Sequence, residues 1–332
     1  MLLDIHGLVI ETHCRSEELL RELLRPFKYF ISDSGTPAAE VFIEETNPPY
    51  GSFPALKSSF STPRNIVFKG EGIKIIDYFG KGAVVEENKG RKFTIYGTDE
   101  SFLQEAFYLL VISRFGQFCD QNGIFRIHAL TFSFRDTAVI FSANAGGGKS
   151  TMALMMLESD VFKIISDDEA LVSDSGRLLP FPIRIGTLDR GRISTVPDEY
   201  VYEIDRMEFG QKFFVDLEYW KKRLETRELD KKIYFVAQRL INGDPRIEKI
   251  SGYGIFKSLI GGAIIGFGLY QGLEFVFNNP FRDTLSLLPV FFRRTVSAIR
   301  FARETTGYRI LLSRDTEKNF RIFEEFIVNL RM

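Results

Sequence analysis

The stretch at 139–151, Val-Ile-Phe-Ser-Ala-Asn-Ala-Gly-Gly-Gly-Lys-Ser-Thr, constrains this 332-residue chain more than any other. An apolar strand leads there into a glycine-rich turn, and a helix-forming run, Met-Ala-Leu-Met-Met-Leu, follows it. Glycines let successive backbone N–H groups wrap a phosphate without interference from a Cβ atom, and the following helix directs its positive end at the anion. This order of strand, loop and helix predicts a nucleotide phosphate site.

The loop matches the pattern G-x-x-x-x-G-K-[ST] at every fixed position except the first, where Ala143 replaces glycine. Lys149 supplies a positive charge opposite the phosphates, and the Ser150 hydroxyl stands where a Mg²⁺ ligand is needed. A flexible turn would also be rich in glycine, but it requires neither the Lys-Ser pair nor the flanking strand and helix. The residues expected to bind the nucleotide are Ala143, Asn144, Ala145, Gly146, Gly147, Gly148, Lys149, Ser150 and Thr151.

The composition is that of an ordinary soluble globular protein, with 45% hydrophobic and 26% charged residues. A net charge of −1, without a basic block at either end, gives no reason to expect nucleic acid as a partner. Cys14 and Cys119 are the only cysteines and lack metal-ligand spacing, which is typical of a protein in a reducing compartment. The first residues lack the pattern of a signal peptide, so we expect a cytoplasmic location.

One apolar segment, 255–277, has to be compared with a membrane-spanning helix. Its uncharged part, 258–273, is sixteen residues long and contains five glycines, whereas a membrane span needs about 20 predominantly apolar residues. We therefore expect a buried helix in this segment and no membrane partner.

Residues 1–122 are expected to form a small N-terminal α+β domain. Residues 2–12 alternate in polarity as a strand does, 16–25 have the leucine spacing of a short helix, and 39–43 form a strand between proline-containing loops. Four short runs separated by glycines predict a small antiparallel sheet, at 65–68, 73–79, 83–86 and 92–96. Helical spacing over 99–122 predicts one long helix that ends this domain.

Residues 123–332 are expected to form the nucleotide-binding domain. Two strands, 125–134 and 137–141, meet at a turn, and the second leads into the glycine loop. A short buried strand at 161–165 ends in acidic residues, and a hairpin follows over 170–179. Further patterns predict strands at 181–185, 213–215, 232–237 and 308–312, and helices at 253–265, 281–304 (broken or kinked at Pro289) and 315–330. The predicted fold class is α/β (α+β) with mixed sheets.

A second chemical signal follows eighteen residues after Lys149, where an apolar strand ends in Asp167 and Asp168. One carboxylate at the tip of a strand can hold Mg²⁺, and the other can accept a proton from an attacking hydroxyl group. The Asp-Asp-Glu run would also suit a solvated turn, but the nearby phosphate loop favours a functional pair. We predict Asp167 as the general base, and Asp168 as a metal ligand together with Ser150.

His128 lies on the strand that precedes the loop strand. Considered alone, a histidine in a sheet is more often a structural residue than a catalytic one. Both interpretations stay open from the local pattern.

Taken together, these residues resemble a known family. The order His128-Ala129, then 143–151, then Ser166-Asp167-Asp168, at short separations, is similar to the HPr kinase/phosphorylase group and its relatives with a phosphoenolpyruvate carboxykinase-like core. The resemblance is clear over about 125–186. It implies a core of that type with mixed sheets, in which Lys149 contacts the β- and γ-phosphates of ATP, one aspartate binds Mg²⁺ with Ser150, the other is the general base and His128 takes part in catalysis. HPr kinases are hexamers, so the resemblance also makes a homo-oligomer an expectation.

Arg184 is a further candidate that comes from the same resemblance. HPr kinases carry a Glu-x-Arg-Gly signature, and here Pro182 and Ile185 stand in place of the Glu and the Gly around the arginine. An arginine can clamp a phosphate through paired N–H groups, and an arginine on a surface strand is the alternative. The departure argues against carrying over recognition of HPr and the reverse phosphorylase activity.

The leading hypothesis is an ATP- and Mg²⁺-dependent kinase that transfers the γ-phosphoryl group to a hydroxyl, expected to be a serine of a protein or peptide. A ribosomally made peptide and a small molecule such as free serine remain alternative acceptors. The second hypothesis is a catalytically silent, nucleotide-binding regulatory protein, which Ala143 and Pro182 favour. A transport or motor ATPase would need a distant acidic strand end, and a transporter a serine-glycine-glycine signature, and the sequence has neither.

Overall fold

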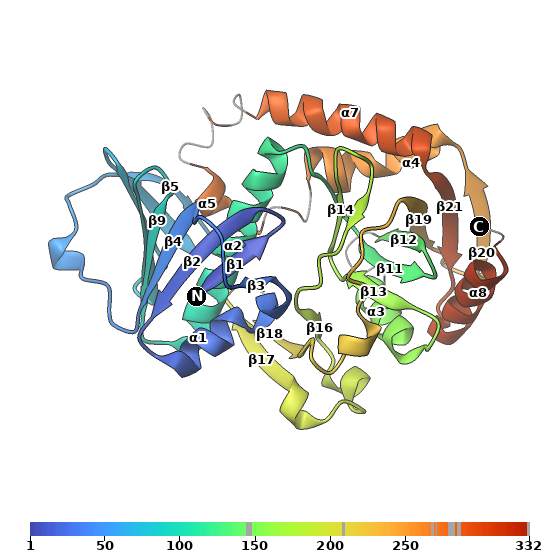
Figure 1. Cartoon of the computed structure of the whole chain (residues 1–332), viewed down its shortest axis with the longest axis horizontal. Coiled ribbons are helices and arrows are strands. Elements are labelled where there is room, and N and C mark those ends of the chain that lie inside the picture. The colour runs from blue at the N-terminus through green and yellow to red at the C-terminus, as the bar shows by residue number, and fades with distance from the viewer. Residues whose placement is uncertain are drawn as a thin grey trace.

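The computed structural model describes residues 1–143, 148–207, 210–266, 269, 271–277, 283 and 287–330. In these residues, parallel and antiparallel strands form four sheets with helices packed against them, so the α/β (α+β) class is confirmed. Figure 1 shows the largest sheet on one side of the molecule, a second large sheet on the other and helix α2 between them. The α-helices of the described residues are α1 (Glu17–Leu24), α2 (Glu100–Gln121), α3 (Lys149–Glu158), α4 (Gly252–Leu259), the short α5 (Leu273–Val276), α7 (Leu288–Glu304) and α8 (Thr316–Asn329).

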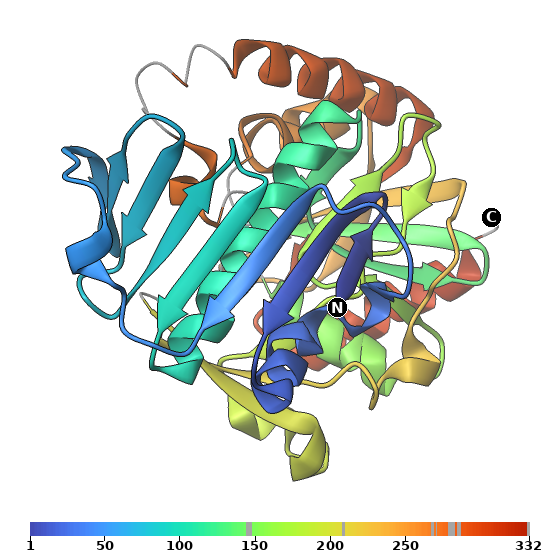
Figure 2. The same ribbon diagram turned by 60° about the vertical axis from the view of Figure 1, so that its left-hand side comes forward.

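The first sheet contains nine of the described strands, all of which precede residue 98. In spatial order they are β3 (Ile31–Ser32), β1 (Leu2–Ile5), β2 (Leu8–Cys14), β4 (Ala39–Glu44), β9 (Lys92–Gly97), β8 (Gly82–Glu87), β7 (Ile73–Asp77), β6 (Asn65–Lys69) and β5 (Ser58–Thr62). Figure 2 shows α2 running behind this sheet. The antiparallel runs predicted at 65–96 are present, but the sheet is larger than predicted because β9 also pairs with β4 in parallel.

The strand predicted at 2–12 is wrong in one respect, because the structure folds it into a hairpin. β1 and β2 pair antiparallel, with Ile5 opposite Leu8, and His6 and Gly7 form the two-residue turn. Both turn residues have a positive φ, +52° at His6 and +96° at Gly7, as the tight turns favoured in hairpins require.

Three smaller sets of strands surround the loop region. The six-stranded sheet has the order β13 (Lys163–Ser166), β11 (Leu130–Phe134), β12 (Thr137–Ala143), β19 (Lys231–Arg239), β21 (Thr306–Leu312) and β20 (Arg246–Ile250). Two three-stranded sheets consist of β10 (Phe125–His128), β14 (Glu169–Val172) and β15 (Leu178–Leu179), and of β16 (Ile185–Thr187), β18 (Gly210–Val215) and β17 (Val201–Arg206). The remaining short helical segments are η1 (Arg25–Phe30), η2 (Tyr50–Ser52), η3 (Arg190–Ile193), η4 (Asp198–Tyr200), η5 (Lys221–Arg223) and the π-helical η6 (Ile260–Ile265).

The six-stranded sheet is covered by helices on both faces. Along β12, Val139 and Phe141 belong to the core shared with α3 and α8, whereas Ala138 and Ile140 belong to the core shared with α4 and α7. Successive side chains of a strand point to opposite faces, so a continuous apolar run is what a strand covered on both sides requires.

Several predicted boundaries differ in this second part of the chain. The predicted strand 125–134 is two strands in two sheets, β10 and β11, with Ala129 between them. The prediction for 181–185 is wrong over most of its length, since β16 begins only at Ile185. Pro289 lies in the first turn of α7, where its missing N–H breaks no helical hydrogen bond, so α7 begins there, in agreement with the predicted break. Most of the preceding segment, 281–286, lies outside the described residues.

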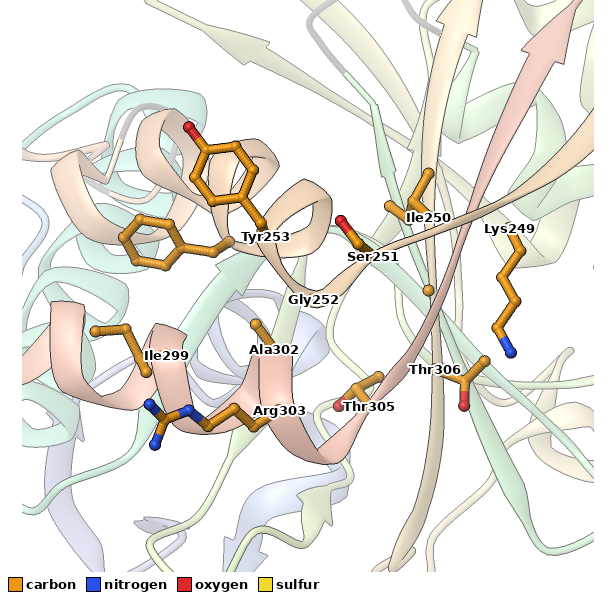
Figure 3. A pocket seen from close by; sticks show the side chains of 12 residues that line it. Lys249, Ile250, Ser251, Gly252, Tyr253, Ile299, Ala302, Arg303, Thr305 and Thr306 are labelled. Atoms are coloured by element: carbon orange, nitrogen blue, oxygen red, sulfur yellow. The ribbon is translucent and has the colours of Figure 1, made fainter.

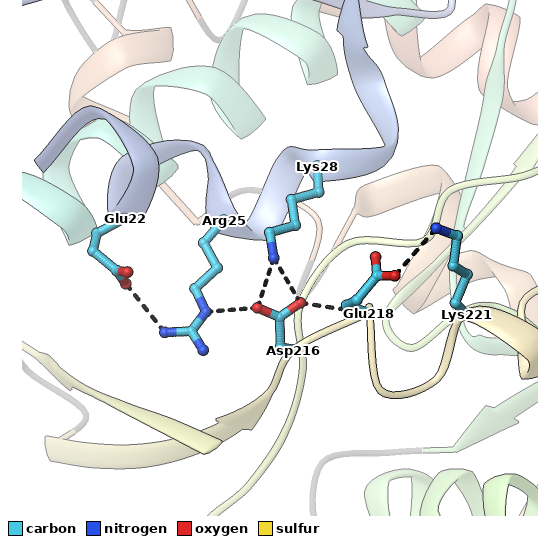
Figure 4. A network of polar contacts seen from close by, with 6 residues as sticks. All are labelled: Glu22, Arg25, Lys28, Asp216, Glu218 and Lys221. Carbon is cyan, nitrogen blue, oxygen red and sulfur yellow. Dashed lines mark hydrogen bonds and ion pairs between the residues drawn. The ribbon is translucent and has the colours of Figure 1, made fainter. Parts of the chain in front are cut away.

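Ionic and apolar contacts join the two parts of the molecule. Asp216, which follows β18, accepts hydrogen bonds from Arg25 Nε at 2.9 Å and Lys28 Nζ at 2.8 Å (Figure 4). The core beneath the nine-stranded sheet also includes side chains from later in the chain, such as Leu179 and Phe181. In the described part of the chain, no helix combines the length and apolar character that crossing a membrane requires.

Candidate functional site

The described end of the glycine loop is Gly148, where the chain turns into α3. Gly148 is the N-cap of α3 and has a φ of +93°, a conformation that glycine adopts readily and other residues rarely do. Lys149 is then the first residue of the helix, at its positive end. The other predicted loop residues, Asn144, Ala145, Gly146 and Gly147, lie outside the described residues.

The ammonium group of Lys149 contacts His128 at the end of β10 and Ala143 at the end of β12. Its Nζ atom lies 2.5 Å from Nε2 of His128 and donates to the carbonyl oxygen of Ala143 at 3.2 Å. Burial lowers the pKa of Lys149, and the negative charges of Asp168 and Asp167 oppose this shift. The loop lysine, the histidine and the acidic pair predicted from the sequence therefore lie in one cluster.

The hydrogen bonds of His128 fix which ring nitrogen carries the proton. Its Nδ1 lies 3.1 Å from the backbone carbonyl oxygen of Asp168, which can only accept, so Nδ1 is the donor. Nε2 then has a free lone pair and accepts from the Lys149 ammonium. Burial lowers the pKa of His128, and the charge of Lys149 lowers it further, so the ring is neutral at physiological pH.

The acidic pair occupies the two-residue turn between β13 and β14. β13 pairs with β11 and β14 pairs with β10, which places His128 opposite Glu169 and directly beside the turn. The carbonyl oxygen of Asp168 also accepts a hydrogen bond from the N–H of Ala129 at 3.0 Å. The acidic turn is therefore hydrogen-bonded to the chain at Ala129, where β10 has ended and β11 begins.

Asp167 is buried, with 3% of its surface exposed, so the solvated-turn alternative does not describe it. Within the described part of the chain, its Oδ1 atom has no hydrogen-bond partner. Burial and the neighbouring charge of Asp168 raise the pKa of Asp167 to about 7, against the opposing effects of Lys212, Lys149 and a backbone hydrogen bond from Gly186. A carboxyl group that titrates near neutral pH is suited to accept a proton in catalysis.

Glu169, the third acid of the run, takes part in a different network. It is also buried, and Oε2 lies 3.5 Å from Arg126 Nη1. Arg126 is in turn 3.9 Å from Asp120, to which Arg294 of α7 is paired at 2.7 Å. These contacts hold β14 against α2 and α7, so we assign Glu169 a structural role.

The residues at this site fit a magnesium ion that is shared with phosphates. Asp168 is half-buried, Ser150 is exposed at the start of α3 and Thr151 beside it is half-buried. Among the described residues, no group of three or more His, Cys, Asp or Glu side chains is placed to form a metal cage. Mg²⁺ is ordinarily held by one or two carboxylates, water and substrate phosphates.

Arg184 does not join this cluster. Both of its terminal nitrogens donate to Glu105 Oε2 at 3.3 Å, and its guanidinium lies over the rings of Tyr108 and Phe214. Its side chain is 7% exposed, so it is neither a phosphate clamp facing a cleft nor a surface strand arginine. Its ion pair with Glu105 on α2 and its contact with the ring of Phe214 on β18 join these two elements.

Two cations near the site were not among the sequence predictions. Arg239 ends β19, the parallel neighbour of the loop strand, and its Nη2 lies 3.7 Å from where a Cβ atom at Gly148 would stand. Lys212 of β18 is the first of the positive charges that oppose the raised pKa of Asp167. The only sequence signal for Arg239 is its place two residues after the predicted strand 232–237, because ligands of open α/β sheets bind at the carboxyl ends of the strands.

The chain matches no protein-family model, and none of the curated proteins matches it either. The case for this site therefore rests on the positions of its residues and on their chemistry.

Proposed function

We propose that the chain is an ATP- and Mg²⁺-dependent kinase that transfers the γ-phosphoryl group to a hydroxyl, with serine of a protein or peptide as the preferred acceptor. The observation that carries the proposal is the position of the buried Asp167 carboxyl group in one cluster with Lys149 and His128, where burial and then the charge of Asp168 raise its pKa to about 7. A phosphate cradle alone serves binding. A base that titrates near neutral pH beside the cradle lysine serves phosphoryl transfer.

Phosphate binding is supported by the position of the loop. The end of β12, the end of its parallel neighbour β19 and the start of α3 lie together, and a helix start next to the carboxyl ends of parallel strands favours anions. Lys149 and Arg239 provide two positive charges in this place. His128 acts as a positioning residue, because its neutral ring holds the ammonium group without repelling it.

In the proposed reaction, the acceptor hydroxyl gives its proton to a carboxylate oxygen of Asp167. The hydroxyl oxygen bonds to the γ-phosphorus, and the bond from that phosphorus to the β–γ bridging oxygen breaks, so ADP leaves with the electron pair. Lys149 compensates the negative charge on the phosphate oxygens throughout. Mg²⁺, which Ser150 and Asp168 would hold, supplies further charge neutralisation.

We also propose a phosphoenolpyruvate carboxykinase-type core for 123–332 and a cytoplasmic location. The core is supported by the placement of the glycine loop and the acidic turn at the ends of β12 and β13, two strands of one sheet that both pair with β11. The location is supported by the two free cysteines, Cys14 and Cys119, of which the second is buried.

The proposal is tested by incubating the chain with γ-labelled ATP, Mg²⁺ and lysate from its own organism. We expect one specific acceptor to be labelled by the wild type and by Lys163→Ala, a control at the exposed start of β13, but not by Lys149→Ala. Calorimetry of ATP binding accompanies the assay. ATP binding without labelled protein, peptide or free serine would support the silent regulatory protein instead, and wild-type ATP affinity in Lys149→Ala would rule out the cradle.

A further inference from the structure

Helix α7 lies along the outer edge of the molecule (Figure 1) and exposes apolar side chains there. Four large apolar side chains on it are between 38% and 71% exposed, and they are, in increasing order, Ile299, Val296, Leu288 and Phe292. Their spacing of four, four and three residues along the chain places all of them on one side of the helix, over a length of about 16 Å. The kinase proposal assigns this stripe no role.

Helix α4 widens the apolar surface. The start of α4 lies against the end of α7, and Tyr253 of α4 and Ile299 of α7 line the same groove (Figure 3). Tyr253 is 75% exposed, and Ile260, which follows α4, is 41% exposed. Among the described residues, no α-helix other than α7 exposes more than one large apolar side chain. An apolar surface that extends over two helices indicates that something else covers it.

The charged side chains of these two helices are mostly basic. Lys257 of α4 and Arg293 and Arg303 of α7 are exposed, and none of the three forms an ion pair with another described residue. Helix α4 contains no acid, and the only acid of α7, Glu304, pairs with Arg300 at 3.0 Å. Uncompensated positive charge therefore accompanies the apolar surface, and it favours an anionic partner.

Three comparisons favour a membrane surface as this partner. A symmetric contact with a second copy would place the same basic residues of both copies near each other. A protein partner would need a matching pocket for each protruding side chain, such as Phe292 or Tyr253, whereas lipid adapts to side chains of any shape. Arg and Lys beside Phe, Leu and Tyr are also the residues with which helices lie on anionic membranes.

We propose that the outer face of α4 and α7 binds the surface of a membrane that contains anionic lipids. The stripe on α7 and the ring of Tyr253 would enter the boundary between headgroups and acyl chains, and Lys257, Arg293 and Arg303 would face the lipid phosphates. Helices that lie in the plane of the membrane need not span it, so the short length of the apolar segment 258–273 does not argue against this contact. The proposal replaces the sequence-based expectation of no membrane partner.

The test measures co-sedimentation of the full chain with vesicles at low salt. The vesicles consist of phosphatidylcholine alone or of phosphatidylcholine mixed with phosphatidylglycerol. We expect binding to the anionic vesicles to be at least about tenfold stronger, and to weaken as salt is raised, because ions screen the lipid charges. Phe292→Trp provides a second measurement, since lipids brominated in their acyl chains should quench its fluorescence. The wild type, whose Trp220 is 8% exposed, gives the background.

The variants locate the binding. Phe292→Gln should weaken binding to anionic vesicles by about tenfold, because a large apolar side chain no longer leaves water. Adding Val296→Gln should weaken it further. Arg293→Gln and Arg303→Gln should each weaken it by about fivefold, the scale of one basic residue at an anionic surface. All four positions are half-exposed or exposed on one helix, where glutamine is a good helix former.

Two matched controls lie outside α4 and α7. Leu188→Gln replaces a 69% exposed apolar residue that follows β16, and Lys222→Gln removes an exposed charge from η5; both should bind the vesicles as the wild type does. Wild-type binding in the Phe292→Gln, Val296→Gln double variant would overturn the proposal. So would absence of vesicle binding, or a dimer of the free chain that Phe292→Gln dissociates, because a second copy would then cover the face. These outcomes do not depend on whether the chain transfers phosphate.

Discussion

The Nε2 atom of His128 lies 2.5 Å from Nζ of Lys149, while Nδ1 of the same ring faces the carbonyl oxygen of Asp168 at 3.1 Å. The ring thus connects the acidic turn to the loop lysine, and it can do so only as the neutral tautomer with its proton on Nδ1. Protonation of Nε2 would remove the acceptor and place two cations side by side.

We predict that His128→Ala weakens ATP binding by about tenfold, because the ammonium of Lys149 loses one of its two holding contacts. The pKa of His128 is lowered from 6.5, so acid affects the wild type only when the pH falls below that value. Titration calorimetry from pH 5 to 8 should show an acid loss of ATP affinity in the wild type that is reduced in His128→Ala. His13→Ala, at a half-exposed histidine of β2 far along the chain from the loop, is the control. An unchanged pH profile in His128→Ala would exclude the positioning role.

A second prediction concerns Arg239, which lies beside Gly148 at the end of β19. Arg239→Gln should weaken ATP binding several-fold, by about 1 kcal/mol, because one exposed positive charge near the phosphates is lost. The effect should shrink as salt is raised from 0.05 to about 0.5 M, since ions screen exposed charges. Lys231→Gln removes a charge from the opposite end of the same strand and should leave the affinity unchanged. Equal losses in the two variants would indicate a general charge effect and not a contact.

Local sequence signals were sufficient for the elements that bracket the site. Ser16 and Asp99 cap α1 and α2 as their positions before leucine- and phenylalanine-rich runs predict. Gly148 has a positive φ, the backbone conformation that favours glycine over other residues. Lys149, His128 and Asp167 lie together because two short strand pairings bring their segments side by side.

Other features depend on pairings that no local pattern reveals. The strand-like pattern at 125–134 does not show that the chain passes from one sheet to another at Ala129. Arg184 binds Glu105, 79 residues earlier in the chain, so its burial could not be read from the residues around it. The place of Arg239 follows from the parallel pairing of β12 with β19, which joins strands almost a hundred residues apart.

A third prediction concerns the contact between the two parts of the chain at Asp216. Burial alone would raise the pKa of Asp216, but hydrogen bonds from Glu218 N–H, Lys28 and Arg25 outweigh it and hold the pKa below 3.8. Because the folded-state pKa is lower than the unfolded value, this contribution to stability is complete above about pH 4 and is lost as the pH falls further. Asp216→Asn should lower the free energy of unfolding at pH 7 by about 2 kcal/mol, since the largely buried Arg25 loses one of its two charged partners and keeps only Glu22.

Urea unfolding at pH 7 and at pH 3 checks the Asp216 prediction. The difference between wild type and Asp216→Asn should be smaller at pH 3, where the wild-type carboxylate begins to protonate. Asp198→Asn is the control, because Asp198 pairs with Arg190 at an exposed position and should change stability little. A pH-independent difference would show that packing, and not the ion network of Figure 4, supplies the effect.

The last prediction separates the two carboxylates of the acidic turn by stability, which needs no knowledge of the acceptor. The pKa of Asp167 rises from 3.8 to about 7 on folding. Between these values the folded chain keeps a proton that the unfolded chain has lost, so stability falls as the pH rises from about 4 to 7 and stays lower above 7. Asp167→Asn is neutral at every pH. It should therefore be more stable than the wild type at pH 8, by at most about 4 kcal/mol, and should differ little at pH 4.5.

The same substitution should remove catalysis while it stabilises the fold. We expect Asp167→Asn to bind Mg²⁺-ATP almost normally and to transfer phosphate at least about 10²-fold more slowly, because an amide cannot accept the hydroxyl proton. Wild-type transfer should rise with pH through about 7, where Asp167 loses its proton.

Asp168→Asn, at the half-buried neighbour, should instead raise the Mg²⁺ requirement and stabilise the fold less. Single-turnover transfer and urea unfolding at pH 4.5 and 8 measure both variants. If Asp167→Asn is no more stable than the wild type at pH 8, Asp167 is not a buried carboxylate with a raised pKa. If Asp167→Asn transfers phosphate at the wild-type rate, Asp167 is not the general base.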